Sequence, residues 1–174
     1  MKINMGLSMR RAGMKPNWLS GLLVGALLLT GNAWGQESPL VSTLESYLIV
    51  EEGGLEQREP ADQVEPGDVI EYHLLYSNVS DRELSGLAVI GPIPENTTYV
   101  ADSNSASVNA AFTVDAGYEE GFQEEPYVRT VIDENGNAQN VVVPPEEYTQ
   151  LRWEPVGSIA PEETQTYVYR VKVD

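Results

Sequence analysis

The chain has 174 residues, with 27 acidic against 10 basic side chains, a formal net charge of −17, one histidine and no cysteine. So acidic a surface repels nucleic-acid phosphates and anionic lipid head groups, and neither is an expected partner. Without cysteine the chain has no disulfide framework, no thiolate metal site and no thiol nucleophile. The single histidine, His73, leaves little material for an imidazole-based zinc site.

Residues 1–35 show the three-part pattern of a signal peptide. They contain no acidic residue and four of the ten basic ones, all at or before Lys15. The apolar run at 18–29 is about 12 residues long, whereas a helix that crosses a bilayer needs about 20. Ala33 and Gly35 place small residues at the two positions that a signal peptidase inspects. We predict cleavage after Gly35, which gives an exported protein, periplasmic or extracellular, with no further membrane insertion. An uncleaved anchor is the alternative.

The rest of the chain is expected to form one all-β domain. Its apolar residues alternate with period two and show no sustained helical period. Turn signals recur about every ten residues, which is typical of a sandwich of two antiparallel sheets. A closed barrel is the structural alternative. We assign residues 36–43 to a flexible lead-in and residues 44–174 to the single domain.

The first half of the domain contains four expected strands, at 44–50, 55–59, 69–78 and 84–90. The clearest is 69–78, which follows a Pro-Gly-Asp turn at 66–68. Because successive side chains of a strand point to opposite sides, Ile70, Tyr72 and Leu74 should share the core face. Glu71 and His73 should then lie on the other face.

The second half contains six further expected strands, at 97–100, 108–114, 127–132, 138–143, 148–153 and 165–173. Asn135-Gly136 lies between the third and fourth of these and predicts a hairpin with a type I′ turn. Leu151 and Trp153 are predicted to face the core. Tyr167, Tyr169 and Val171 alternate with polar residues and should share one face of the last strand.

Three segments, taken in order, carry a resemblance to a known family. The first is the Pro-Gly-Asp turn and strand at 66–78, which ends in Asn78. The second is the strand, proline and Thr-Thr-Tyr-Val run at 87–100. The third comprises Trp153, the Ile-Ala-Pro-Glu-Glu run at 159–163 and the alternating strand at 167–173. Together they resemble the conserved repeat domain (DUF11) of exported bacterial proteins, and Phe112 to Gly117 also resembles a segment of that family.

Two positions depart from the family pattern. Many members carry Asp where this chain has Gly91, and the closing Gly of the family is Glu162 here. The resemblance implies an immunoglobulin-like sandwich on an exported or cell-surface protein. It implies no general enzymatic activity, because the shared residues are turn and core residues. Members often occur as tandem arrays, and this chain holds one copy.

His73 is the first candidate for chemistry. Nucleophilic catalysis would require it beside a serine or threonine and a carboxylate, and the sequence has no Gly-x-Ser-x-Gly elbow. We therefore expect His73 to be exposed or paired across strands, and we assign no catalytic residue. A hydrolase that uses two carboxylates, or a carbohydrate-binding module, is the alternative from another class. Among 27 acidic residues, some pair lies close by chance.

The acidic loops supply the only cofactor candidate, Ca²⁺. Its candidate ligands are Asp133, Glu134, Asn135 and Asn137. An EF-hand needs Gly at the sixth position and Glu at the twelfth, and this loop has neither, so we favour a solvated hairpin turn. Two further groups are interpreted as a charged face that keeps the domain soluble. They are Glu119-Glu120 with Glu124-Glu125, and Glu146-Glu147 with Glu162-Glu163.

These patterns together favour a non-catalytic, exported β-sandwich module of the cell envelope or surface, with a structural or protein-interaction role. The expected partner is an envelope or cell-surface protein, or another copy of the chain. The alternative is a self-assembling fibre or matrix subunit, in which the N-terminal strand of one copy joins the sheet edge of a neighbour. Pairing of that strand within its own domain is the simpler interpretation.

Overall fold

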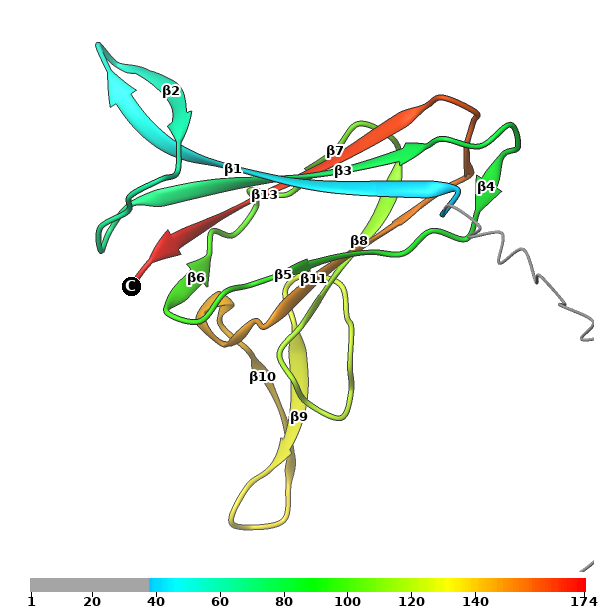
Figure 1. Ribbon diagram of the computed structural model, residues 1–174. Helices are drawn as coiled ribbons and strands as arrows, with labels where there is room; N and C mark the ends of the chain where they lie inside the picture. The colour runs from blue at the N-terminus through cyan, green and yellow to red at the C-terminus, as the bar shows by residue number, and fades with distance from the viewer. Residues whose placement is uncertain (1–37) are drawn as a thin grey trace, which may run out of the picture. The chain divides into compact units, whose positions relative to one another are not determined.

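The computed structural model of the protein describes residues 38–174, so the predicted signal peptide at 1–35 and the first residues of the lead-in lie outside the described residues. Strands and turns make up the described chain, with one short 3-10 turn, η1 (Figure 1). Every strand pair is antiparallel, which confirms the all-β prediction. The elements are β1 (Leu40–Glu52), β2 (Leu55–Pro60), β3 (Val69–Asn78), β4 (Leu84–Ser85), β5 (Val89–Pro92), β6 (Thr97–Tyr99), β7 (Ser105–Ala106), β8 (Ala110–Asp115), β9 (Val128–Ile132), β10 (Ala138–Val142), η1 (Pro145–Glu147), β11 (Gln150–Pro155), β12 (Ser158–Ile159) and β13 (Thr164–Val173).

Two sheets carry the domain. The larger has the order β2-β1-β3-β13-β6, with β7 also paired to β13, and the smaller has the order β5-β11-β8. Two accessory pairs, β9 with β10 and β4 with β12, complete the set. Among residues 38–174, no helix is long and apolar enough to cross a membrane.

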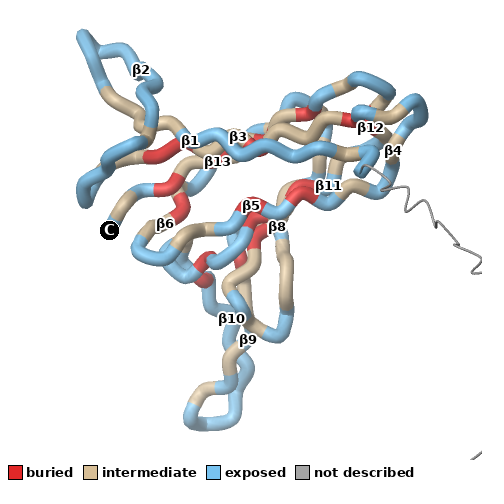
Figure 2. The backbone as a smooth tube through the Cα atoms, viewed as in Figure 1, coloured by how far each residue is buried: buried red, intermediate tan, exposed pale blue. Residues whose placement is uncertain are grey.

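The hydrophobic core lies between these two sheets. The larger sheet contributes Ile70, Leu74 and Tyr169, and the smaller contributes Leu151 and Trp153, all buried. Figure 2 shows the buried segments where the sheets face each other. Period-two alternation along β3, β11 and β13 therefore selects the inward face, as the sequence predicts.

Gly91 of β5 lies against the aromatic core. A β-carbon at this position would lie 2.9 Å from Cε1 of Tyr169 and 3.0 Å from Cζ3 of Trp153. Two buried aromatic rings therefore occupy the space that a side chain would need. A larger residue such as aspartate would not fit against this core at position 91.

Three local predictions are corrected by the structure. Residues 40–43, which we predicted as part of a flexible lead-in, form the start of β1, because their backbone pairs with β3 as far as Asn78. The expected strand 84–90 is divided into β4 and β5, since Gly86 turns the chain at φ +75°. The loop between β9 and β10 is not a type I′ turn, because that turn needs positive φ at two residues and only Gly136 has it.

Asn78 ties three chain segments together at the end of β3. Its side chain is fully buried, and its Nδ2 donates to the carbonyl oxygens of Arg82 (2.7 Å) and Ile159 (2.9 Å). Its Oδ1 accepts from the backbone N–H (3.0 Å) and hydroxyl (2.7 Å) of Ser80. Every hydrogen-bonding position of the amide is thus used.

We expect Asn78→Ala to lower the free energy of unfolding by about 2–3 kcal/mol, because several buried polar groups lose their partner. Urea denaturation followed by far-ultraviolet circular dichroism measures the loss. Asn109→Ala, at an exposed position, is the matched control and should change stability little. Equal losses in the two variants would contradict this role for Asn78.

Glu162 has a left-handed backbone, with φ +62°, in the turn that leads into β13. The family resemblance places glycine at this position, and glycine adopts positive φ without steric cost. We expect Glu162→Gly to raise the free energy of unfolding by about 0.5–1 kcal/mol, since the relieved strain exceeds the entropy that glycine adds to the unfolded chain.

The control for Glu162→Gly is Glu95→Gly, which removes the same charge from an exposed turn residue that does not have positive φ. This variant should lose stability. Thermal unfolding of both variants beside the wild type separates backbone strain from the change in charge. A lower midpoint for Glu162→Gly than for the wild type would show that strain is not the dominant effect.

Candidate functional site

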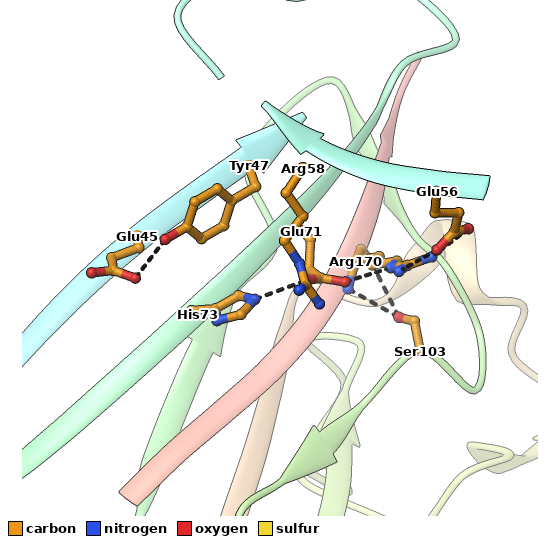
Figure 3. A network of polar contacts seen from close by, with 8 residues as sticks. All are labelled: Glu45, Tyr47, Glu56, Arg58, Glu71, His73, Ser103 and Arg170. Atoms are coloured by element: carbon orange, nitrogen blue, oxygen red, sulfur yellow. Dashed lines mark hydrogen bonds and ion pairs between the residues drawn. The ribbon is translucent and has the colours of Figure 1, made fainter. Parts of the chain in front are cut away.

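A buried carboxylate lies on the outer face of the larger sheet, where strand parity predicts solvent exposure. Glu71 of β3 has only 4 % of its side chain exposed. Its Oε1 accepts from Nε of Arg58 (2.6 Å) and pairs with Nε2 of His73 (2.7 Å). Its Oε2 accepts from Nε of Arg170 (2.8 Å). We call Glu71, Arg58, His73 and Arg170 the Glu71 cluster (Figure 3).

The hairpin of β1 and β2 covers Glu71. Arg58 comes from β2, and so does Glu56, whose two oxygens accept from Nη1 (3.1 Å) and Nη2 (2.8 Å) of Arg170. Arg170 lies on β13, opposite Glu71 in the strand register. Its backbone N–H donates to the hydroxyl of Ser103 (3.0 Å). The cluster therefore joins β2, β3, β13 and the chain that follows β6.

The charges around Glu71 favour its ionised form. Burial opposes ionisation, but hydrogen bonds from His73, Arg58 and Arg170 outweigh that effect and lower the pKa of Glu71 to about 2. The hydrogen bond between Arg170 and Glu56 raises the pKa of Arg170, although burial of Arg170 acts to lower it. Near neutral pH, Glu71 is thus a carboxylate with both oxygens engaged.

This arrangement holds the strands of the larger sheet together, and its geometry does not suit general acid or base catalysis. A general acid or base needs a pKa near the working pH and a free lone pair or proton toward substrate, and Glu71 has neither. The ring of His73 packs edge-on against Tyr47, with centroids 5.1 Å apart and planes at 71°. Of the two expected placements of His73, exposed or paired across strands, this contact with Tyr47 of β1 is of the second kind.

The Ca²⁺ candidates form a hydrogen-bonded hairpin loop. Oδ1 of Asp133 accepts from the backbone N–H groups of Asn135 and Asn137, both at 2.9 Å, and Oδ2 accepts from Nε2 of Gln139 at 3.0 Å. These bonds lower the pKa of Asp133. Within residues 38–174, no three acidic or histidine side chains are placed to hold a metal ion. The carboxylate of Asp133 therefore closes the loop, and Glu134 is exposed.

The acidic group of Glu146-Glu147 with Glu162-Glu163 does not converge. Glu146 and Glu147 belong to η1, which lies near β6, and β6 pairs with the C-terminal end of β13. Glu162 and Glu163 come directly before the N-terminal end of β13. The length of β13 separates the two groups. In the loop after β8, Glu125 lies beside Asp102, and burial together with that neighbouring charge raises the pKa of Glu125.

The β9–β10 ribbon extends away from the two main sheets (Figure 1). Its strands pair only with each other, and all five residues of β10 are exposed. Three large apolar side chains of the ribbon are exposed: Ile132 at 67 %, Val141 at 42 % and Val142 at 59 %. The sequence predicts this hairpin, but only the structure reveals that neither main sheet covers it.

Strand donation was considered for the N-terminal strand at 36–50, and residues 40–49 of it pair along their length with β3 of the same chain. Donation to a neighbouring copy would require this ladder to open.

Comparisons of the chain with family models, with curated proteins and with solved structures found no match.

Proposed function

We propose that this protein is a non-catalytic, exported module of the cell envelope or surface, with an immunoglobulin-like sandwich and a protein-interaction role. The observation that carries the proposal is the β9–β10 ribbon, which holds Ile132, Val141 and Val142 in solvent. An envelope or cell-surface protein is the partner that we propose.

The ribbon supports an interaction role because packing within the domain does not explain why its apolar side chains are exposed. A two-stranded hairpin alone is marginally stable in water, and exposed valine and isoleucine side chains add no stability there. Several large apolar side chains that lie exposed along one projecting element are typical of contact surfaces. The packed core between the two sheets gives such a ribbon a rigid base.

The family resemblance adds support for the immunoglobulin-like assignment. Gly67 of the first segment adopts φ +99° in its turn, and Glu162 of the third adopts a conformation suited to glycine. Trp153 of the third segment is buried in the core. Residues that carry the resemblance thus lie where turn and core residues are needed. The signal-like pattern at 1–35 supports export.

Photo-crosslinking in producing cells tests the proposed function. A photoreactive phenylalanine derivative is placed at Ile132 or, as the control, at Val156, which is also apolar, is 73 % exposed and directly follows β11. We expect a discrete adduct with an envelope protein from position 132 and none from position 156. No adduct at position 132, or the same adducts from both positions, would contradict the proposal.

The two alternatives have less support from the described residues. Fibre assembly by strand donation must compete with the β1–β3 ladder. A hydrolase needs two carboxylates in unlike environments within reach of one substrate, and the carboxylate most isolated from solvent, Glu71, is engaged by two arginines and a histidine. A monomer in size-exclusion chromatography at high concentration would exclude the fibre.

A further inference from the structure

A hollow lies at the base of the β9–β10 ribbon. Its volume is about 510 Å³, and its apolar lining includes Phe112, Pro126, Val143 and Tyr148. Val142, at the end of β10, also lines it. The hollow therefore adjoins the exposed ribbon, so that one ligand can contact both.

One face of the ribbon continues the apolar lining of the hollow. Val142 pairs with Val128, and Ala138 pairs with Ile132, and directly paired residues of two antiparallel strands point to the same side. Between these pairs, the hydroxyl of Thr130 donates to Oδ1 of Asn140 at 3.1 Å. This face thus presents two apolar pairs with one polar pair between them, and the side chains on one face of an extended peptide have the same two-residue spacing.

Three carboxylates stand around the hollow, from Asp102, Glu124 and Glu125, and none of its lining residues is basic. The ion pairs among residues 38–174 do not include these three. The one arginine of the ribbon, Arg129, pairs with Val141 and so lies on the opposite face, 3.8 Å from the centroid of the Tyr118 ring. The hollow consequently combines an apolar lining with three carboxylates, and no basic side chain lines it.

We propose that the hollow and the adjoining ribbon face bind an extended protein segment that carries a lysine or arginine, with the cation between Asp102 and Glu125. The inference deepens the proposed interaction function and rests on it. The aliphatic stem of such a side chain suits the walls of Phe112 and Tyr148, and flanking apolar residues suit Val142 and Ile132. Burial, together with the charge of Asp102, raises the pKa of Glu125, and a cation placed between the two carboxylates would relieve that repulsion.

Charge and lining together favour this occupant. An anionic ligand would meet three carboxylates at close range. A bare Ca²⁺ ion needs six to eight oxygen ligands, and apolar side chains occupy much of the lining. A basic side chain on an otherwise apolar extended segment matches both the negative charge around the hollow and its apolar lining.

Fluorescence polarisation with labelled peptides tests the inference. The probe is Ser-Arg-Thr-Val-Thr-Val-Ser, in which arginine and two valines share one face of an extended chain. Two matched probes replace the arginine with norleucine or glutamate. We expect the arginine peptide to bind at least about tenfold more tightly than either. Equal binding of the norleucine peptide, or no binding of the arginine peptide at about 1 mM protein, would overturn the inference.

The protein variant is Asp102→Asn with Glu125→Gln. Asp102 has φ +59°, a conformation that asparagine tolerates, so the fold should persist. Binding of the arginine peptide should fall about tenfold. The control, Glu51→Gln with Glu52→Gln, removes the same charge from exposed positions on the β1–β2 hairpin and should leave binding nearly unchanged. Unchanged binding in the Asp102 and Glu125 variant, or a site filled by Ca²⁺ alone in calorimetry, would overturn the assignment.

The same variant distinguishes this inference from the proposed function. If position 132 still forms its adduct in the Asp102 and Glu125 variant, the interaction function stands and the cation assignment fails. If position 132 forms no adduct in the wild type, the function itself fails.

Discussion

Replacing Trp153 with alanine is expected to lower the free energy of unfolding by about 4 kcal/mol, the largest loss that we predict for one core residue. The indole is 1 % exposed and lies against Phe112, Tyr167 and Tyr169, with ring centroids 5.2, 5.9 and 5.9 Å away. It belongs to the smaller sheet, and both tyrosines belong to the larger one. The truncation therefore leaves a cavity where the two layers meet.

The matched control is Trp153→Phe. Nε1 of Trp153 is buried without a hydrogen-bond partner among the described residues, so phenylalanine removes an unsatisfied donor and keeps most of the apolar contact. We expect it to cost less than half of the alanine loss. Urea denaturation followed by far-ultraviolet circular dichroism compares the two, because the substitution alters tryptophan fluorescence itself. An alanine loss below about 1.5 kcal/mol would show that this indole does not hold the sheets together.

Glu71→Gln is expected to lower the free energy of unfolding by about 3 kcal/mol at neutral pH, because it removes the charge that two arginines and His73 share. The shift in pKa gives a similar magnitude. The pKa of Glu71 is about 2 in the folded protein against 4.5 for an ordinary glutamate, which corresponds to about 3 kcal/mol. The variant should leave the two-sheet core in place, since the cluster lies on the outer face.

The sign of the pH dependence follows from the lowered pKa. The stabilisation is present above the pKa of the unfolded chain and is lost as pH falls toward that of the folded protein. The wild type should therefore lose stability between about pH 5 and pH 2, while the Glu71→Gln variant lacks this component. Denaturation midpoints across this range measure the difference, which should shrink at low pH. A constant difference down to pH 2 would contradict the assigned ionisation.

Glu56→Gln is the control for Glu71→Gln. Glu56 also pairs with Arg170, but its side chain is 59 % exposed. Solvent screens this pair and solvates both partners after the change, so the loss should be much smaller. Similar losses at positions 56 and 71 would mean that burial does not strengthen the Glu71 cluster.

Local sequence patterns predicted the main strands of the two sheets. The alternation in β3, β11 and β13 identified the inward faces, including Leu151, Trp153 and Tyr167, because a strand's side-chain period is fixed by its backbone. The hairpin of β9 and β10 was also predicted from its turn. The predicted type I′ turn was wrong, since only Gly136 has positive φ and the side chain of Asp133 bonds two backbone N–H groups of the loop.

The candidate sites depended on contacts that no local pattern encodes. Glu71 and Arg170 are 99 positions apart in sequence, and strand parity alone places Glu71 on a solvent-facing side. The β1–β2 hairpin covers Glu71 and thereby buries part of that face of the sheet. The hollow beside the ribbon likewise joins Asp102, Glu125 and Val142 from three separate segments.

The sequence by itself determined the strand content, the inward faces and the acidic balance of this protein, because alternation and charge are properties of neighbouring residues and of composition. It also supplied the expectation of export. Only the tertiary structure decided that β1 begins at Leu40, that β2 covers Glu71 and that the ribbon stays outside the sheets. Those features depend on which distant segments pair, and chain folding alone brings such segments together.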